Sequence, residues 1–208
     1  MVNIRRLFPS RLSKPRRKLL ALAEILLEED FPRYRSLLEL LETDLDSFRA
    51  QGYDDRYGIT DEFTAADITQ DLYGALTLLN GFADETGYSF WLDWTGESSE
   101  GSFEIWVAAR VHAFGLGSLD LGFVDDWRDT LDWDSIDRGD FIVEKFRLLG
   151  RHIQPLGLDL IFLNMGEDAY HPYVVRHADY RRLPKITEAD QAAFGFCGIQ
   201  RWDELPKD

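Results

Sequence analysis

The densest group of chemically active side chains lies at residues 125–140, which read DDWRDTLDWDSIDRGD. This stretch contains seven aspartates and two tryptophans. Carboxylates at short spacing can bind Ca²⁺ or Mg²⁺, exchange protons as acids and bases, or form an acidic surface that attracts a basic partner. Within the stretch, Asp132, Asp134 and Asp137 are the candidate metal ligands.

The best-defined metal motif that such a stretch could contain is the calcium loop of an EF-hand, and the sequence departs from it. A loop beginning at Asp132 would place Asp134 correctly at the third position. Ile136 would then stand at the fifth position, Asp137 where the tight turn needs glycine, and Val143 in place of the bidentate glutamate. A cation bound here would therefore need a non-standard carboxylate site.

Some residues of this stretch also have a structural explanation. Asp137 and Asp140 stand at the start of a predicted helix, where carboxylates accept free amide hydrogens and oppose the helix dipole. Trp127 and Trp133 are expected to turn inward and anchor the stretch to the core. The carboxylates expected to face a partner are Asp125, Asp126, Asp129, Asp132 and Asp134.

Other catalytic and cofactor motifs are incomplete. The turn GESSE resembles a nucleophile elbow centred on Ser98, but Glu100 replaces its final glycine. Cys197 is the single cysteine, and the four histidines lack the paired short spacing of a zinc site. The sequence therefore identifies no catalytic residue and no cofactor, and it favours a protein that is not an enzyme.

Charge is distributed unevenly along the chain. Residues 1–18 contain seven basic residues and no acidic one, so the formal net charge of −15 for all 208 residues leaves −22 for residues 19–208. Such a body repels nucleic-acid phosphates, and only the basic N-terminal arm could bind a polyanion. It favours instead a basic protein partner, as when an immunity or inhibitor protein covers a cationic enzyme.

The alternative hypothesis is a small hydrolase or metal-dependent enzyme that uses the carboxylates of residues 125–140. In either case we expect a cytoplasmic protein, because a single cysteine excludes an intramolecular disulfide and fits a reducing compartment. No uninterrupted apolar run approaches the roughly 18 residues that span a bilayer, so we expect no transmembrane segment and a soluble protein.

Helices and strands must position these side chains, and hydrophobic periodicity predicts where they lie. Apolar residues at helical spacing predict helices at residues 13–30, 34–48, 64–87 and 138–155. Ser13 is the expected N-cap of the first helix, and residues 51–63 are expected to form a loop. Residues 101–114 fit both a helix and strand alternation, and a helix is favoured.

Branched and aromatic runs bounded by glycines predict strands at residues 87–96, 157–166 and 170–177. Pro172 favours an edge position or a strand start for the last of these. The predicted fold class is α+β, with N-terminal helices followed by a small mixed sheet of about three to five strands packed with helices. We expect a basic arm at residues 1–18 and a single globular domain at residues 19–208.

After the helix-rich start, three stretches carry a resemblance to a known family. They are FWLDWTGE at 90–97, DFIVEKFRLLGRHI at 140–153 and LDLIFLN at 158–164. Together they resemble an uncharacterised bacterial domain family of unknown function, over most of residues 64–183. The resemblance implies an α+β bacterial domain, and it transfers no functional residue.

Overall fold

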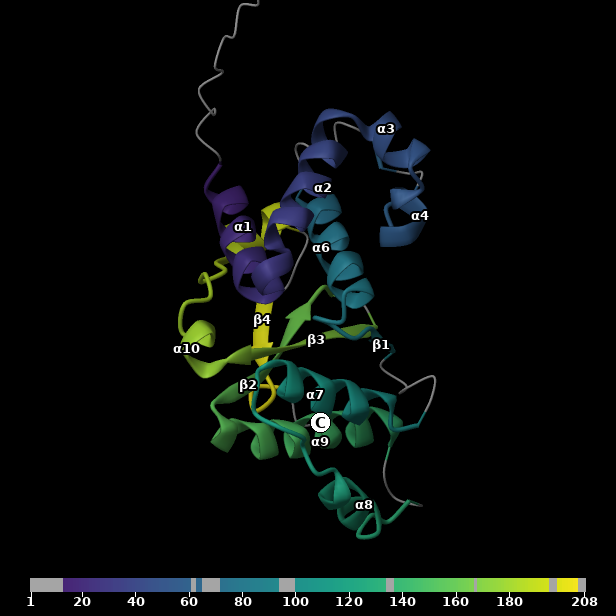
Figure 1. The fold of residues 1–208 in the computed structure, drawn as a ribbon, viewed down its shortest axis with the longest axis vertical. Coiled ribbons are helices and arrows are strands. Elements are labelled where there is room, and N and C mark those ends of the chain that lie inside the picture. Colours follow the sequence, from purple (N-terminus) through teal and green to yellow (C-terminus); the bar gives the residue numbers. More distant parts are fainter. Residues whose placement is uncertain are drawn as a thin grey trace, which may run out of the picture.

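The computed structural model describes residues 13–60, 63–64, 72–93, 100–133, 137–166, 168–194 and 198–205. Helices lead the chain and most strand residues follow, which confirms the α+β class (Figure 1). In chain order the elements are α1 (Lys14–Leu27), η1 (Glu28–Asp30), α2 (Phe31–Thr43), α3 (Leu45–Ala50), α4 (Tyr53–Tyr57), α6 (Tyr73–Glu85), β1 (Leu92–Asp93), α7 (Ser102–Ala113), α8 (Gly122–Arg128), α9 (Arg138–Ile153), η2 (Gln154–Leu156), β2 (Leu158–Asn164), β3 (Ala169–Arg176), α10 (His177–Tyr180), α11 (Glu188–Phe194) and β4 (Gly198–Arg201).

The strands form one sheet in the order β1-β3-β2-β4. All described pairings are antiparallel, where a mixed sheet was expected. The longest ladder joins β2 to β3, from Leu158 opposite Arg176 to Leu163 opposite His171. An antiparallel ladder of this length follows from the short connection between β2 and β3, since two strands joined by a tight turn must run in opposite directions.

β3 lies between β1 and β2, although Pro172 had suggested an edge strand. Within the described residues β1 pairs with Tyr170 and Ala169, so the missing amide hydrogen of Pro172 breaks no bond to β1. The interior position is therefore compatible with proline because the neighbouring strand is so short.

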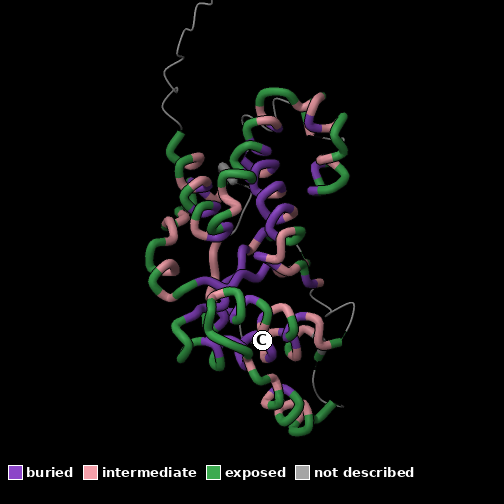
Figure 2. The backbone as a smooth tube through the Cα atoms, viewed as in Figure 1, coloured by how far each residue is buried: buried purple, intermediate pink, exposed green. Residues whose placement is uncertain are grey.

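Both faces of the central strands are buried, and a separate group of helices covers each. Ile161 and Leu163 pack with α1, α2 and α6 on one face, while Leu160 and Phe162 pack with α7 and α9 on the other. Figures 1 and 2 show the resulting layers, with buried residues concentrated in the strands and on the helix faces that meet them. The apolar run at residues 160–163 of β2 is thus typical of a strand covered on both sides.

The N-terminal helices largely confirm the predicted pattern. The Ser13 hydroxyl accepts a hydrogen bond from the Arg16 amide at 3.3 Å, and the predicted apolar face of α1 is buried. The helix predicted at 34–48 is divided at Asp44, which caps α3 by accepting the Ser47 amide hydrogen at 3.0 Å. None of the described helices combines the length and apolar character that crossing a membrane would require.

The boundary expected at residue 18 falls inside α1, because residues 14–18 are helical. Lys18 pairs with Asp190 of α11 and donates to the Lys185 carbonyl at 2.5 Å. Arg16 pairs with Glu42 of α2. The last part of the basic arm therefore packs on its neighbours, while residues 1–12 lie outside the described residues.

Two other predictions need correction. The expected loop at 51–63 contains the short helix α4. Aromatic contacts attach this helix to its neighbours, and one of them brings the ring centroids of Tyr57 and Phe82 to 6.1 Å. The expected strand at 87–96 is described as far as Asp93, and that part contains β1 and one bridge from Ser89 to Tyr173, while residues 94–96 lie outside the described residues. The amide hydrogen of Trp91 is donated to the side chain of Asp84 at 2.9 Å. The segment favoured as a helix at 101–114 is α7.

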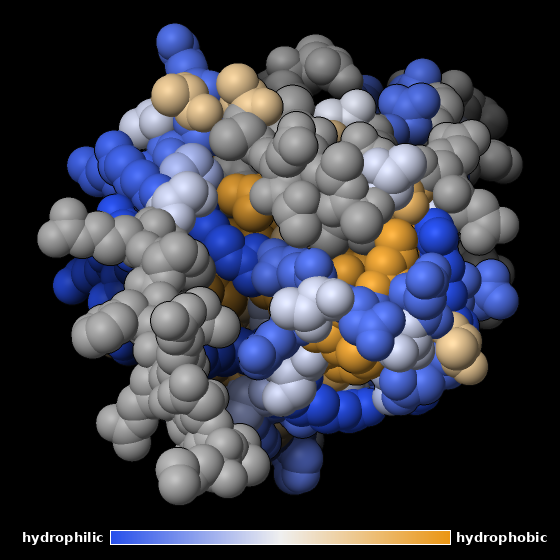
Figure 3. Space-filling model, turned by 90° about the horizontal axis from the view of Figure 1, so that it is seen from above, coloured by the Kyte–Doolittle hydropathy of each residue, from blue (hydrophilic) through white to orange (hydrophobic). Residues whose placement is uncertain are grey.

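Figure 3 looks down on the helices at the top of Figure 1, and that face is mainly hydrophilic, with hydrophobic residues visible in recesses between the polar ones. Within the described residues, the exposed large hydrophobic side chains all come after α6 in the sequence. They are Trp91, Ile105, Leu116, Trp133 and Leu156.

Gly150 provides a test of how closely α9 packs against the C-terminal segment. A Cβ atom at this position would overlap the indole of Trp202, which is buried. Gly150→Ala should therefore destabilise the protein by about 1 to 3 kcal/mol, despite the better helix propensity of alanine. Urea unfolding measures the change. Arg151→Ala, at an exposed position of the same helix, should stay within about 0.5 kcal/mol of wild type; equal effects of both variants would contradict the close packing.

Buried tyrosines predict loss of stability at alkaline pH. Burial raises the pKa of Tyr34 and Tyr173 well above the ordinary value, and raises the pKa of Tyr88 to about 12. Because the folded pKa lies above the unfolded one, the stabilisation is complete below about pH 10 and is lost as the pH rises through the folded values. The urea midpoint should fall steeply between about pH 10 and 12, and less steeply in Tyr34→Phe; identical slopes for the two proteins would refute the assignment.

Candidate functional site

The aspartates expected to face a partner lie on and beside α8. Asp125 and Asp126 belong to this helix, Asp129 follows its last residue, and all three are exposed. Figure 1 shows α8 projecting beyond α9 on the side away from the sheet. The side chain of Asp125 remains 80% exposed although it lies 3.7 Å from Arg128. The structure therefore brings these three carboxylates together on one protruding element.

The remaining predicted site residues are less concentrated. Asp132 is exposed, and Asp134 lies outside the described residues. Asp137 is the N-cap of α9, where its carboxylate accepts the Gly139 amide hydrogen at 3.3 Å, as the sequence predicted. Across the described ranges, no group of three or more His, Cys, Asp or Glu side chains is placed to hold a metal ion.

A buried ion cluster lies beneath α8 and attaches it to the rest of the molecule. Oε1 of Glu104 in α7 is 2.7 Å from the Arg128 guanidinium and 3.2 Å from Nζ of Lys145 in α9. The side chains of Glu104 and Lys145 are only 4% and 2% exposed. Arg128 is the basic residue of α8, and its guanidinium turns inward onto this cluster. The acidic outer surface of α8 and its ionic inner attachment are thus parts of one arrangement.

Aromatic side chains fill the space between α8 and α9. Trp127 stacks on Phe141 with ring centroids 5.3 Å apart, and Trp133 lies against the same ring at 5.2 Å. Trp127 is half-buried, which agrees with its predicted role as an anchor. The prediction for Trp133 was wrong, since this residue is 57% exposed. Among the described residues, the ring contact of Trp133 is made with Phe141, a ring on which Trp127 also stacks.

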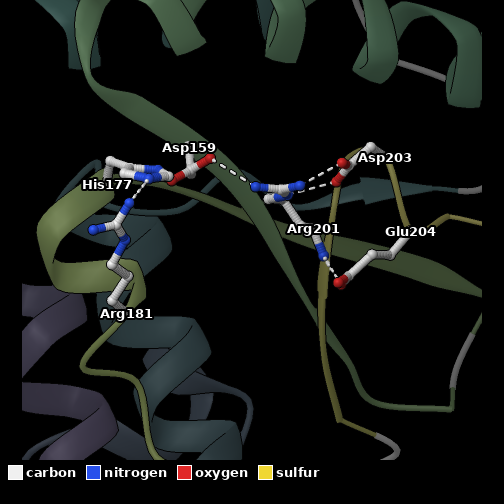
Figure 4. A network of polar contacts seen from close by, with 6 residues as sticks. All are labelled: Asp159, His177, Arg181, Arg201, Asp203 and Glu204. Atoms are coloured by element: carbon white, nitrogen blue, oxygen red, sulfur yellow. Dashed lines mark hydrogen bonds and ion pairs between the residues drawn. The ribbon is translucent and has the colours of Figure 1, made fainter.

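Sequence reasoning missed a second polar cluster, which is drawn in Figure 4. Asp159 of β2 is fully buried, and its Oδ2 accepts a hydrogen bond from Nδ1 of His177 at 2.6 Å. The other ring nitrogen, Nε2, lies 2.9 Å from a guanidinium nitrogen of Arg181. A guanidinium can only donate, so Nε2 accepts and the ring proton lies on Nδ1, facing Asp159.

Arg201 of β4 completes this cluster. Its Nη1 lies 3.7 Å from Asp159, while its Nε donates to Asp203 at 2.5 Å and its amide donates to Glu204 at 2.9 Å. The cluster joins β2, β4 and α10, and the imidazole faces a guanidinium instead of a nucleophile, so we assign it a structural role. The sequence did contain one signal for it, a carboxylate within the otherwise apolar run of β2.

Ser98 and Cys197 are outside the described residues. His171 is buried in β3, whereas His177 begins α10, so the two do not share one regular strand.

Removal of Glu104 should be costly because it leaves Lys145 and Arg128 without their shared carboxylate. Glu104→Gln should destabilise the fold by about 3 kcal/mol, as expected when one member of a buried ion cluster is neutralised. Chemical denaturation gives the value. Asp125→Asn removes the exposed carboxylate that also faces Arg128 and should change stability by no more than about 0.5 kcal/mol. Equal effects of the two substitutions would show that the buried cluster does not hold α8.

Comparison with protein-family models identifies a family for this chain. A family model described as a domain of unknown function (DUF6630) matches residues 18–197. No curated protein and no solved structure matches the chain. The matched segment contains every described element from α7 to α10, including the acidic helix, the buried ion cluster beneath it and the central strands. The chain therefore belongs to the DUF6630 family.

Proposed function

We propose that this protein is a non-catalytic binding protein that docks a basic protein partner through the outer surface of α8. The observation that carries the proposal is the division of charge on this helix. Asp125, Asp126 and Asp129 are exposed together, while Arg128 turns inward to Glu104. An exposed acidic face whose basic residue is withdrawn is complementary to a cationic surface.

The charge of the whole chain supports the same partner. Residues 19–208 carry a formal charge of −22, which would attract a basic protein over a distance and raise its association rate. This attraction is screened by salt, with a Debye length of about 8 Å at physiological ionic strength. Binding should therefore weaken steeply as salt is added, and nucleic acids should be repelled by the same field.

Trp133 supplies the apolar contact that a purely acidic surface would lack. Tryptophan is enriched among the residues that contribute most to protein interfaces. With more than half of its surface exposed beside the aspartates of α8, Trp133 is placed to bury its indole against a partner. We also propose that the protein acts in the bacterial cytoplasm and without a cofactor, which its single cysteine and its incomplete cofactor motifs support.

A charge-matched pair of triple variants tests the proposal. Wild type, Asp125→Asn/Asp126→Asn/Asp129→Asn, and the control Glu24→Gln/Glu39→Gln/Asp46→Asn are used as baits in extract of the native cell. The control removes the same formal charge from exposed positions of α1, α2 and α3. A basic protein should be retained at about 50 mM salt by wild type and the control, released near 300 mM, and lost with the α8 variant.

The captured partner is then purified and its affinity measured by calorimetry. The α8 variant should bind at least about tenfold more weakly, and Trp133→Ala should also weaken binding. Equal loss with both triple variants would show that net charge alone is responsible, and retention by all baits would place the interface elsewhere. A divalent-cation-dependent hydrolysis lost in Asp132→Asn and Asp137→Asn would instead support the metal-dependent enzyme.

A further inference from the structure

A cavity of about 500 Å³ lies between α4, α6 and the segment around β1. Its floor includes Asn80, Met165 and His171, which are buried, and its rim includes Asp84, Trp91 and Arg56, which are exposed. This volume is in the range of small-molecule sites, and its lining combines apolar groups with a few polar ones as such sites do.

The position of α4 shapes one wall of this cavity. Gly81 of α6 faces α4 so closely that a Cβ atom there would lie 2.8 Å from the Tyr57 carbonyl oxygen. Glycine therefore lets the backbone of α4 lie directly against α6. Gly58, which follows Tyr57, ends α4 with a left-handed φ of +71° and also lines the cavity.

The floor offers a hydrogen-bond donor group to a ligand. The Tyr173 hydroxyl donates to Oδ1 of Asn80 at 2.8 Å. This contact occupies the amide oxygen and directs the NH₂ group of Asn80 away from Tyr173. Within the described part of the chain that NH₂ group has no hydrogen-bond partner. It is therefore available to an acceptor oxygen on a bound molecule.

The rim offers a carboxylate next to an aromatic face. Oδ1 of Asp84 accepts the backbone amide hydrogen of Trp91 at 2.9 Å, which fixes the two residues beside each other. No described residue forms a hydrogen bond with Oδ2 of Asp84. Trp91 is 53% exposed at the mouth of the cavity. A carboxylate beside an exposed indole is the arrangement that attracts an ammonium group, through charge and through the electron-rich ring face.

The remaining charges of the lining favour a cation over an anion. Arg56 forms an ion pair with Glu85, so the positive charge at the rim is matched. The Arg56–Glu85 pair has no net charge, so the carboxylate of Asp84 gives the lining one net negative charge when His171 is left out of the sum. The strongly acidic body adds to the attraction of cations and opposes phosphates and carboxylates.

We propose that this cavity binds a small organic amine. Its ammonium group pairs with Asp84 and lies on Trp91, and an acceptor oxygen elsewhere in the ligand takes the hydrogen bond from Asn80. This site is separate from α8, and it stands or falls independently of the proposed protein docking.

Tyramine and tyrosol are suitable probes because they differ only in an ammonium group and a hydroxyl group. Ligand-observed NMR titration should show tyramine binding about tenfold more tightly than tyrosol. Asp84→Asn keeps an oxygen for the Trp91 amide but removes the charge, so it should bring the two affinities within about twofold of each other. Asp55→Asn, an exposed position of α4 outside the lining, is the matched control and should retain the tenfold preference.

Fluorotryptophan labelling locates the bound probe. The ¹⁹F resonance that is missing in Trp91→Phe should be the one that tyramine shifts in the wild-type protein. The proposal is overturned if tyramine and tyrosol bind equally, if tyramine does not bind at up to about 10 mM, or if Asp84→Asn and Asp55→Asn behave alike. A shift confined to the other tryptophans would likewise overturn it.

Discussion

The ladder between β2 and β3 is buried on both faces, and the layout of the molecule depends on this constraint. Alternate residues of β2 point to opposite sides, so Ile161 and Leu160 need different helices to remove them from water. The N-terminal helices and α6 cover one side, and α7 and α9 cover the other. Neither helical group could be lost without exposing half of the ladder, which makes the layers interdependent.

Charged groups buried beside these layers are each tied to more than one element. Asp159 lies within the central strand and is met by His177 from α10 and Arg201 from β4. Glu104 is met by side chains from α8 and α9. A charge removed from water is unfavourable unless it is paired, so each cluster penalises any arrangement in which its elements separate. The clusters therefore specify how the layers are assembled, beyond the apolar contacts that hold them.

The sequence predicted features that depend on local patterns. The apolar periodicity of α1 and α9, the run of β2 and the capping role of Asp137 were all readable, because each is determined within a few residues. The pairing of β1 was not readable, since it depends on Ala169 and Tyr170 of β3, which lie far away in the sequence.

The sites were harder to predict for the same physical reason. The aspartates of α8 were recognised as an acidic surface, but the burial of Glu104 and the exposure of Trp133 depend on how α7, α8 and α9 meet. His177 and Asp159 are eighteen positions apart and are brought together by the β2–β3 turn. The cavity needs the close approach of α4 to Gly81, which no sequence period indicates.

The attachment of α8 has a consequence for how this family could diversify. The helix is held from the inside, by the buried Val124 and by the ions of Glu104, Arg128 and Lys145, while its outer carboxylates contribute little to the fold. Substitutions on the outer surface are therefore nearly neutral for stability. Evolution can alter this outer surface residue by residue while the scaffold beneath it stays unchanged, so relatives with the same core could present different surfaces.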